Sequence, residues 1–164
     1  MNHKFKSIID RLCSYTKRSD MRHKLAAGLF YTRKGMLSIG CNSSRSYVRR
    51  SLVATLHAEV AALHQFSKQY PRLKTRGLKL IVVRFSSSGM LGFSLPCENC
   101  RTMIRQFGIR KIYYINEGGE LVCESIDQLK SCNNILTDRW FLTVTSDPSC
   151  LLRKINDTLK RFNG

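Results

Sequence analysis

Residues 78–100 read LKLIVVRFSSSGMLGFSLPCENC, and two signals in this stretch decide the fold. The first eight residues are mostly apolar and rich in β-branched side chains, which is typical of a strand buried on both faces of a sheet. A Ser- and Gly-rich loop follows, and residues 97–107 then predict a short helix. Cys97 and Cys100 therefore lie in the first turn of a helix that comes soon after a buried strand.

Helical and strand patterns alternate before this stretch. Apolar side chains at helical spacing predict an amphipathic helix at about residues 4–17. Alternating residues at 25–31 and 36–41 predict a β-hairpin that turns at Gly35. Two further segments follow, a Ser- and Arg-rich loop at 42–50 and a helix at 52–67.

After the decisive stretch we expect strands at 111–115 and 120–123, joined by a tight turn. A helical turn at 127–132, a strand at 140–145 and a last amphipathic helix from residue 147 complete the pattern. Strands separated by helices predict a layered α/β domain with a mixed sheet. Because no repeat or boundary is visible, we interpret residues 1–164 as one domain with a C-terminal extension, at about 127–164, that matches no known pattern.

The charge of the chain is unusual. It has 28 Lys and Arg against 11 Asp and Glu, a net charge of +17, and residues 1–50 contain twelve of the basic and two of the acidic side chains. Two interpretations stay open. The basic side chains are a solubilising surface, or they bind a polyanion or a phosphorylated substrate.

Cysteine use and hydropathy indicate the compartment. Seven cysteines, an odd number at irregular spacing, favour reduced thiols in an intracellular protein over a disulfide framework. No apolar run approaches the roughly 18 residues that a membrane span needs. The charged N-terminus does not resemble a secretory signal. We therefore expect a cytoplasmic or nuclear protein without a membrane partner.

Two motifs offer ligands to one metal ion. They are His57-Ala58-Glu59 and Pro96-Cys97-Glu98-Asn99-Cys100. A catalytic zinc needs three protein ligands and one open position for water, and His57, Cys97 and Cys100 supply one nitrogen and two sulfurs. A helix N-terminus also favours the thiolate form of cysteine. Zinc lowers the pKa of bound water from about 15.7 to about 7, and Glu59, two residues from a ligand, is the candidate proton shuttle.

Other interpretations of these residues exist. A Cys-x-x-Cys pair is often a redox pair, and a single His is often a packing residue. A structural zinc normally has a fourth Cys or His, but the other five cysteines are scattered and we interpret them as packing residues. His64 shares a helical face with His57, and we interpret it as a buried structural residue.

The two motifs together resemble those of the cytidine deaminase superfamily, and the resemblance extends over about residues 25–123. It implies a three-layer α/β/α fold around a five-stranded mixed sheet whose last two core strands form an antiparallel hairpin. It implies Zn²⁺ bound by His57, Cys97 and Cys100, with Glu59 as the catalytic proton shuttle. Gly40-Cys41-Asn42 is similar to a substrate-binding element of the family. The substrate-binding residues implied by the resemblance are Asn42, Ala58 and Pro96.

The branch of the superfamily is mixed. The motif His57-Ala58-Glu59 is similar to that of deoxycytidylate, tRNA-adenosine and polynucleotide cytidine deaminases, whereas free-cytidine deaminases usually have Cys at the position of His57. Those enzymes also usually have Glu where this chain has Ser44. In contrast, a hairpin turn at Gly118-Gly119 is the free-cytidine arrangement.

We expect a zinc-dependent hydrolytic deaminase that converts cytosine to uracil in a nucleotide or single-stranded DNA or RNA, through zinc-bound hydroxide. An aromatic side chain such as Phe30, Tyr47 or Phe93 is a candidate to stack on the base. Three alternatives stay open: a free cytidine or deoxycytidine deaminase, an adenosine-type tRNA deaminase, and a catalytically silent, zinc-containing nucleic-acid-binding protein. Because family members often form dimers or tetramers, a homo-oligomer is a further expectation.

Overall fold

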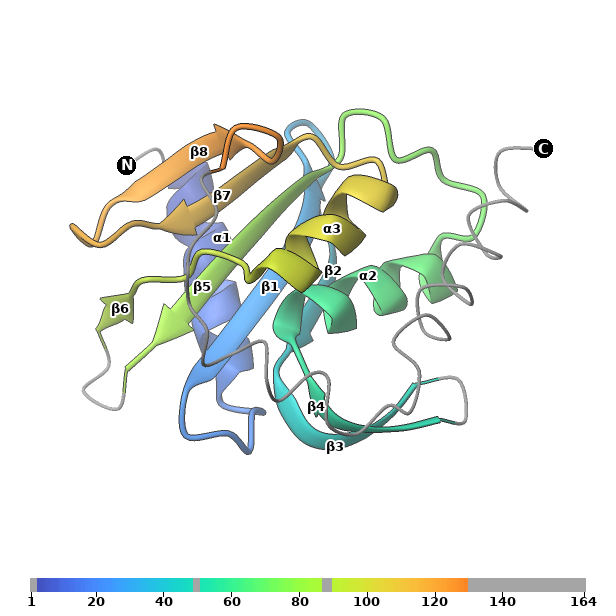
Figure 1. Ribbon diagram of the computed structural model, residues 1–164. Coiled ribbons are helices and arrows are strands. Elements are labelled where there is room, and N and C mark those ends of the chain that lie inside the picture. Colours follow the sequence, from blue (N-terminus) through green and yellow to red (C-terminus); the bar gives the residue numbers. More distant parts are fainter. Residues whose placement is uncertain (1–2, 49–50, 87–89, 130–164) are drawn as a thin grey trace.

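A mixed β-sheet forms the centre of the protein (Figure 1). The computed structural model describes residues 3–48, 51–86 and 90–129. The sheet has six strands. Five of them lie in the order β2-β1-β5-β7-β8, and the sixth, the short β6, pairs with β5. Their bounds are β1 Lys24–Tyr31, β2 Gly35–Cys41, β5 Lys79–Phe85, β6 Leu91–Gly92, β7 Lys111–Ile115 and β8 Leu121–Ser125.

The strand directions confirm the predicted mixed sheet. β1 is antiparallel to both β2 and β5, β5 is parallel to β7, and β7 is antiparallel to β8. A parallel pair needs a crossover connection, and the crossover from β5 to β7 contains helix α3 (Glu98–Gln106). The β7–β8 hairpin turns through Gly119, whose φ of 79° favours glycine.

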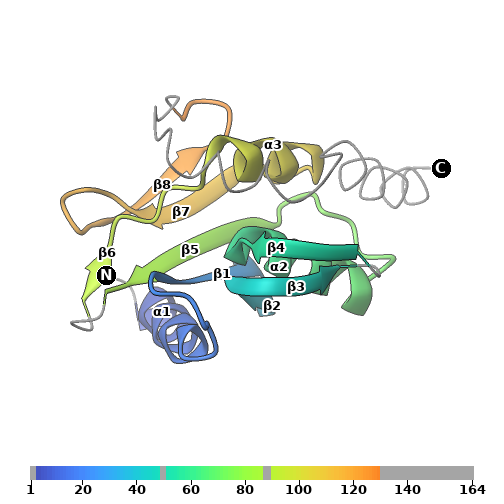
Figure 2. The ribbon, with the colours of Figure 1, turned by 60° about the horizontal axis from the view of Figure 1, so that its bottom comes forward.

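Helices cover both faces of the sheet, as the resemblance implied (Figures 1 and 2). Helix α1 (His3–Thr16) lies on one face, and α2 (Ala58–Gln69) and α3 lie on the other. The burial of β5 alternates accordingly. Leu80 and Val82 belong to the core under α2 and α3, whereas Ile81 and Val83 belong to the core under α1. The prediction of a strand buried on both faces is therefore confirmed.

The region before α2 differs from the prediction. Residues 42–50 were expected to be a loop and 52–67 a helix, but Ser43–Val48 (β3) and Ser51–Leu56 (β4) pair as an antiparallel hairpin outside the main sheet. The segment SLVATL contains the β-branched residues Val53 and Thr55, which favour a strand. The helical spacing applies only from Ala58, where α2 begins.

The C-terminal expectations fall largely outside the described residues. A short turn follows β8, in which the Gln128 N–H donates to the Ser125 carbonyl at 3.0 Å. The rest of the predicted helical turn at 127–132, the strand at 140–145 and the last helix lie beyond residue 129. In the described part of the chain, no helix is both long and apolar enough to cross a membrane.

Candidate metal centre

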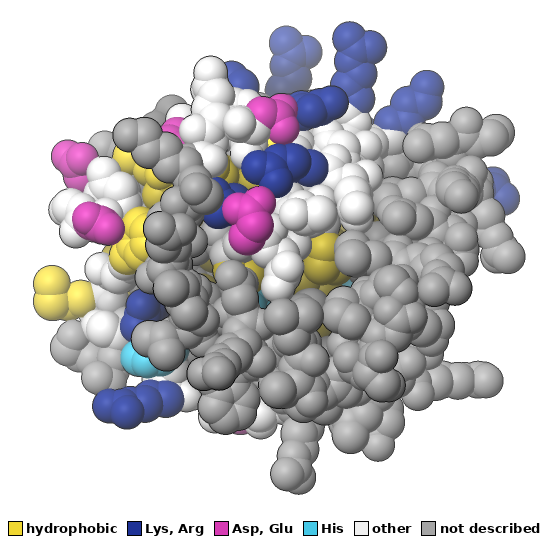
Figure 3. All heavy atoms as spheres, in the orientation of Figure 1, with side chains coloured by type: hydrophobic (Ala, Val, Ile, Leu, Met, Phe, Trp, Pro, Cys, Tyr) yellow, Lys and Arg dark blue, Asp and Glu magenta, His cyan; other side chains and the backbone are white. Residues whose placement is uncertain are grey.

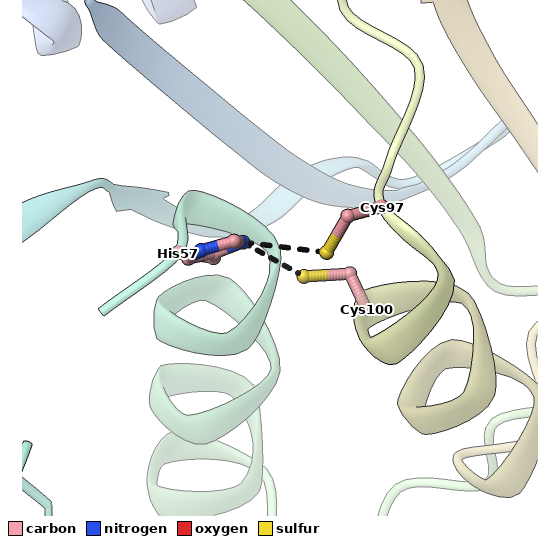
Figure 4. Close-up of side chains that lie close together, drawn as sticks. All are labelled: His57, Cys97 and Cys100. Carbon is pink, nitrogen blue, oxygen red and sulfur yellow. Dashed lines mark hydrogen bonds between the residues drawn. The ribbon is translucent and has the colours of Figure 1, made fainter. Parts of the chain in front are cut away.

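His57 and Cys97 occupy equivalent positions at the ends of two helices. Each is the N-cap residue, His57 of α2 and Cys97 of α3, with extended backbone at ψ of 149° and 164°. Neither side chain caps its own helix by a hydrogen bond. Figure 4 shows both side chains, together with Cys100 from the first turn of α3, pointing toward one another. Two helix N-termini on the same face of the sheet therefore bring the three predicted ligands together.

The distances between the three side chains fit a tetrahedral zinc site. The Nδ1 atom of His57 lies 3.6 Å from the Sγ atom of Cys97 and 3.3 Å from the Sγ atom of Cys100. One ligand atom from each residue lies within 4.8 Å of the others. Tetrahedral zinc with Zn–S of about 2.3 Å and Zn–N of about 2.0 Å places N and S ligands about 3.5 Å apart. The donor set and its spacing therefore suit Zn²⁺, and three protein ligands leave the fourth position for water.

Two of the three side chains line a cavity. Cys100 is buried, while His57 and Cys97 are half-buried. The cavity has a volume of about 320 Å³, and both His57 and Cys97 line it. This volume is within the range typical of small-molecule sites. A metal held here would be closed off on the Cys100 side and open toward the cavity.

The protein groups around the two thiols give them different pKa values. A hydrogen bond from Cys100 and the nearby His57 imidazole lower the pKa of Cys97 from 9.0 to about 4. The same hydrogen bond, together with burial, raises the pKa of Cys100. Cys97 is thus the preferred thiolate, which is the form that binds zinc.

Glu59 lies next to this cluster in the first turn of α2. It is 3% exposed and lines the same cavity. Burial raises the pKa of its carboxyl group, while His57 lowers it and Cys97 raises it. A buried carboxyl group whose pKa is moved toward neutrality is suited to taking up and releasing a proton.

The three residues predicted to bind substrate, Asn42, Ala58 and Pro96, all line the cavity. The carboxamide of Asn42 already makes three hydrogen bonds within the protein. Its Oδ1 accepts from Ser19 Oγ at 2.7 Å and from Leu25 N at 2.8 Å, and its Nδ2 donates to the His23 carbonyl at 2.6 Å. An amide has two donors and two acceptor lone pairs, so one N–H of Asn42 has no partner among the described residues and can be donated to a ligand.

Two other expectations can now be placed. Phe93 lines the cavity, but Phe30 packs on the opposite face of the sheet with Phe5 and Tyr113, so Phe30 was a wrong candidate for stacking on a base. His64 is not part of the metal cluster among the described residues.

Five further residues that line the cavity were not predicted from the sequence. They are Met21, Arg22, His23, Arg84 and Glu98. Arg84 had a signal that was not used, because it follows Leu80 and Val82 at a period of two and so shares their face of β5.

Gly40 sets the distance between α2 and the sheet. A Cβ atom on Gly40 would lie 2.3 Å from the Ala62 backbone nitrogen and 2.6 Å from the Ala58 carbonyl oxygen. Both are backbone atoms, so the helix itself would have to move. We expect Gly40→Ala to destabilise the protein by about 1–3 kcal/mol and to weaken zinc binding, because His57 is the N-cap residue of this helix.

Chemical denaturation and zinc content per chain test this prediction. Gly28→Ala is the matched control, since its Cβ would meet the flexible end of the Met36 side chain, at 2.4 Å from the sulfur. Equal losses in the two variants would contradict the role given to Gly40.

A three-layer fold with a His-Cys-Cys group at two helix N-termini defines a zinc-binding deaminase. Residues 2–116 match the family described as "Cytidine and deoxycytidylate deaminase zinc-binding region". Because the match covers more than half of the chain, the protein belongs to this family, and it is a hydrolytic enzyme of the cytidine/deoxycytidylate deaminase type.

Solved structures share the fold at low sequence identity. Cytidine deaminase from Burkholderia pseudomallei is 19% identical with a TM-score of 0.56, over 77% of this chain and 94% of that chain. The dCMP deaminase of cyanophage S-TIM5, solved with dCMP and dUMP, is 24% identical with a TM-score of 0.52, over 71% and 84%. Cytidine deaminase from Mycobacterium leprae is 16% identical with a TM-score of 0.53, over 77% and 97%. No curated protein sequence matches the chain.

Proposed function

We propose that this enzyme deaminates cytosine to uracil in a nucleotide or a single-stranded polynucleotide, with zinc bound by His57, Cys97 and Cys100. The observation that supports the proposal is the position of Glu59, a buried carboxyl group beside the three ligands and in the wall of one cavity. A purely structural zinc site has no need of that carboxyl group. Bound zinc supplies a Lewis acid that lowers the pKa of a coordinated water to about 7.

Glu59 is assigned the proton transfers by comparison with Glu98. Hydrolytic deamination replaces the amino group of the base by oxygen from water and releases ammonia, so protons must reach the ring nitrogen and the leaving amino group. Glu59 and Glu98 are the acidic residues among the described lining of the cavity. Glu98 forms ion pairs with Arg101 and Arg105, so its carboxylate already has two cationic partners. Among the described residues, no Lys or Arg forms an ion pair with Glu59, and burial raises the pKa of its carboxyl group.

The other cavity residues are assigned to binding the base. Ala58 is the first residue of α2, and its N–H is one of those that a helix leaves without an internal acceptor. It is therefore offered to the carbonyl oxygen of a base. The remaining N–H of Asn42 is a second donor, while Pro96 and Phe93 provide apolar walls.

A second candidate is deamination of the free nucleoside. The antiparallel pairing of β7 and β8 favours it, because this is the arrangement of free-cytidine deaminases that the sequence resembles. Both candidates use the same residues for chemistry and differ in what carries the base.

A product assay separates the candidates. Zinc-loaded protein is incubated with cytidine, deoxycytidine, their 5′-monophosphates, adenosine, and single-stranded DNA and RNA, and ammonia and the product base are measured. We expect uracil from the phosphorylated cytosine substrates. Product from adenosine alone, or from none of the panel, contradicts the proposal.

A further inference from the structure

Two arginines line the same cavity as Glu59 and His57. They are Arg22, in the segment before β1, and Arg84, near the end of β5. The alternation on β5 places Arg84 on the face of Leu80 and Val82, which is the face covered by α2 and α3. The guanidinium group of Arg84 is therefore carried by the same sheet face as the candidate metal centre.

The neighbouring strand orients Arg84. Leu25 of β1 pairs with Arg84, and His23 lies just before the first residue of β1. Nη2 of Arg84 lies 2.9 Å from Nδ1 of His23. The His23 carbonyl in turn accepts the hydrogen bond from Asn42. A guanidinium has five N–H donors, so this contact fixes its position and leaves donors for a ligand.

Two nearby acidic residues, Glu98 and Asp20, have other partners. Glu98 is paired with Arg101 and Arg105, and Asp20 accepts hydrogen bonds from the backbone N–H and hydroxyl of Ser44. Among the residues that the structure describes, ion pairs join Arg101, Arg105 and Arg110 to acidic residues, and none involves Arg22 or Arg84. In the described part of the chain, the positive charge of Arg22 and Arg84 is thus not paired with a carboxylate.

Net charge alone does not locate this site. Figure 3 shows Lys and Arg side chains in more than one place on this face, along the upper edge and beside a histidine side chain at the lower left. What distinguishes Arg22 and Arg84 is that they line the cavity that also contains the candidate chemistry.

We infer that Arg84, together with Arg22, binds a phosphate group of the substrate while the base lies against Glu59. Arginine binds phosphate through paired, charge-assisted hydrogen bonds, and its fork of donors suits this geometry better than the point charge of lysine. The substrate class is then a 5′-phosphate monoester or a phosphodiester of cytidine or deoxycytidine, not the free nucleoside. This inference rests on the proposed function, because it assumes that the base binds at the metal centre.

The test is the ratio of kcat/KM for the monophosphate to kcat/KM for the nucleoside. We expect a ratio above about 10 in the wild type and a fall of about 10- to 100-fold in Arg84→Gln, as for loss of a charge-assisted hydrogen bond. Arg22→Gln should lower the ratio in the same direction. Arg84→Lys keeps the charge without the fork and should fall between wild type and Arg84→Gln. Arg72→Gln, the control, removes the same charge from an exposed position past the far end of α2 and should keep the ratio.

Thermal unfolding of each variant shows whether a change in ratio comes from misfolding. A wild-type ratio near 1, or an unchanged ratio in a folded Arg84→Gln, overturns the inference and leaves the cytosine deaminase proposal standing. The phosphate site is tested independently of turnover by calorimetric binding of UMP and uridine to zinc-loaded protein. A preference for UMP that depends on Arg84, without turnover of any cytosine substrate, supports the phosphate site and refutes the proposed reaction.

A salt series separates the two sources of phosphate. For a single-stranded oligonucleotide that contacts several phosphates, log K falls with log salt by about 0.7 per phosphate. The salt dependence is measured for dCMP or CMP as well as for the oligonucleotide. A slope for the oligonucleotide that corresponds to one phosphate assigns the site to a mononucleotide. A slope of several phosphates assigns it to a polynucleotide backbone.

Discussion

The Glu59→Gln variant is expected to fold, to keep its zinc and to lose turnover by about 100- to 10,000-fold, the usual contribution of a general acid–base group. Glutamine has nearly the shape of glutamate and retains one carbonyl oxygen, so the buried site is not emptied. It cannot take up and release a proton at neutral pH. The loss should therefore appear in kcat with a much smaller change in KM. Steady-state kinetics and zinc content per chain, measured on the same preparation, check both parts of the prediction.

The control for this variant is Glu117→Gln. Glu117 is exposed in the turn between β7 and β8, and it does not line the cavity. The Glu117→Gln substitution removes the same charge at a distance from the cavity, so the kinetics of this variant should match those of the wild type. Normal turnover in Glu59→Gln, with normal zinc, would remove Glu59 from the role of proton shuttle and would direct attention to Glu98.

The elements that the sequence predicted well have strong local patterns. β5 is a run of apolar, β-branched residues, and its burial on both faces was expected from composition alone. α1 has an apolar face at helical spacing, with Ile8, Ile9 and Leu12 buried. The β1–β2 hairpin turns at Gly35, whose φ of 81° is unfavourable for other residues.

The errors arose where the local signal was weak or shared. The segment 43–48 is rich in Ser and Arg, a composition that resembles a loop, yet it finds hydrogen-bond partners in β4. The helix prediction began six residues too early because the small and apolar residues of 52–56 fit either period. β6 has only two residues, which is too short for any periodic pattern.

The residues of the candidate site were also predicted only in part. His57, Cys97 and Cys100 were predicted to meet because two short motifs each carry their own spacing, and the structure brings them together. Arg22 and Arg84 were missed because 61 residues separate His23 from Arg84, and only the register of β1 against β5 places them at one cavity. The group of three metal ligands was thus predictable from local motifs, whereas the proposed phosphate site depends on pairing between distant strands.

Cys100→Ser is expected to lose zinc and to lower the melting temperature of the protein. Cys100 is 1% exposed and lies against α2 through its contact with His57, so its sulfur is held in place for a metal. A serine hydroxyl is a poor zinc ligand at neutral pH, which leaves two protein ligands in place of three. A ligand present at 100 times its Kd stabilises the folded state by about 2.7 kcal/mol. For a chain of this size that loss corresponds to a fall of about 5–10 °C.

Metal analysis and thermal unfolding, with and without a chelator, test this prediction together. The chelator should bring the wild type down to the melting temperature of Cys100→Ser and leave the variant unchanged, because the variant has no zinc to lose. Added zinc should restore the wild type alone. Cys123→Ser is the matched control, since Cys123 is an exposed thiol on β8 that is not part of the metal cluster. A Cys100→Ser protein with full zinc content would exclude Cys100 from the ligands. A chelator effect of equal size in both proteins would show that the stabilising metal is bound elsewhere.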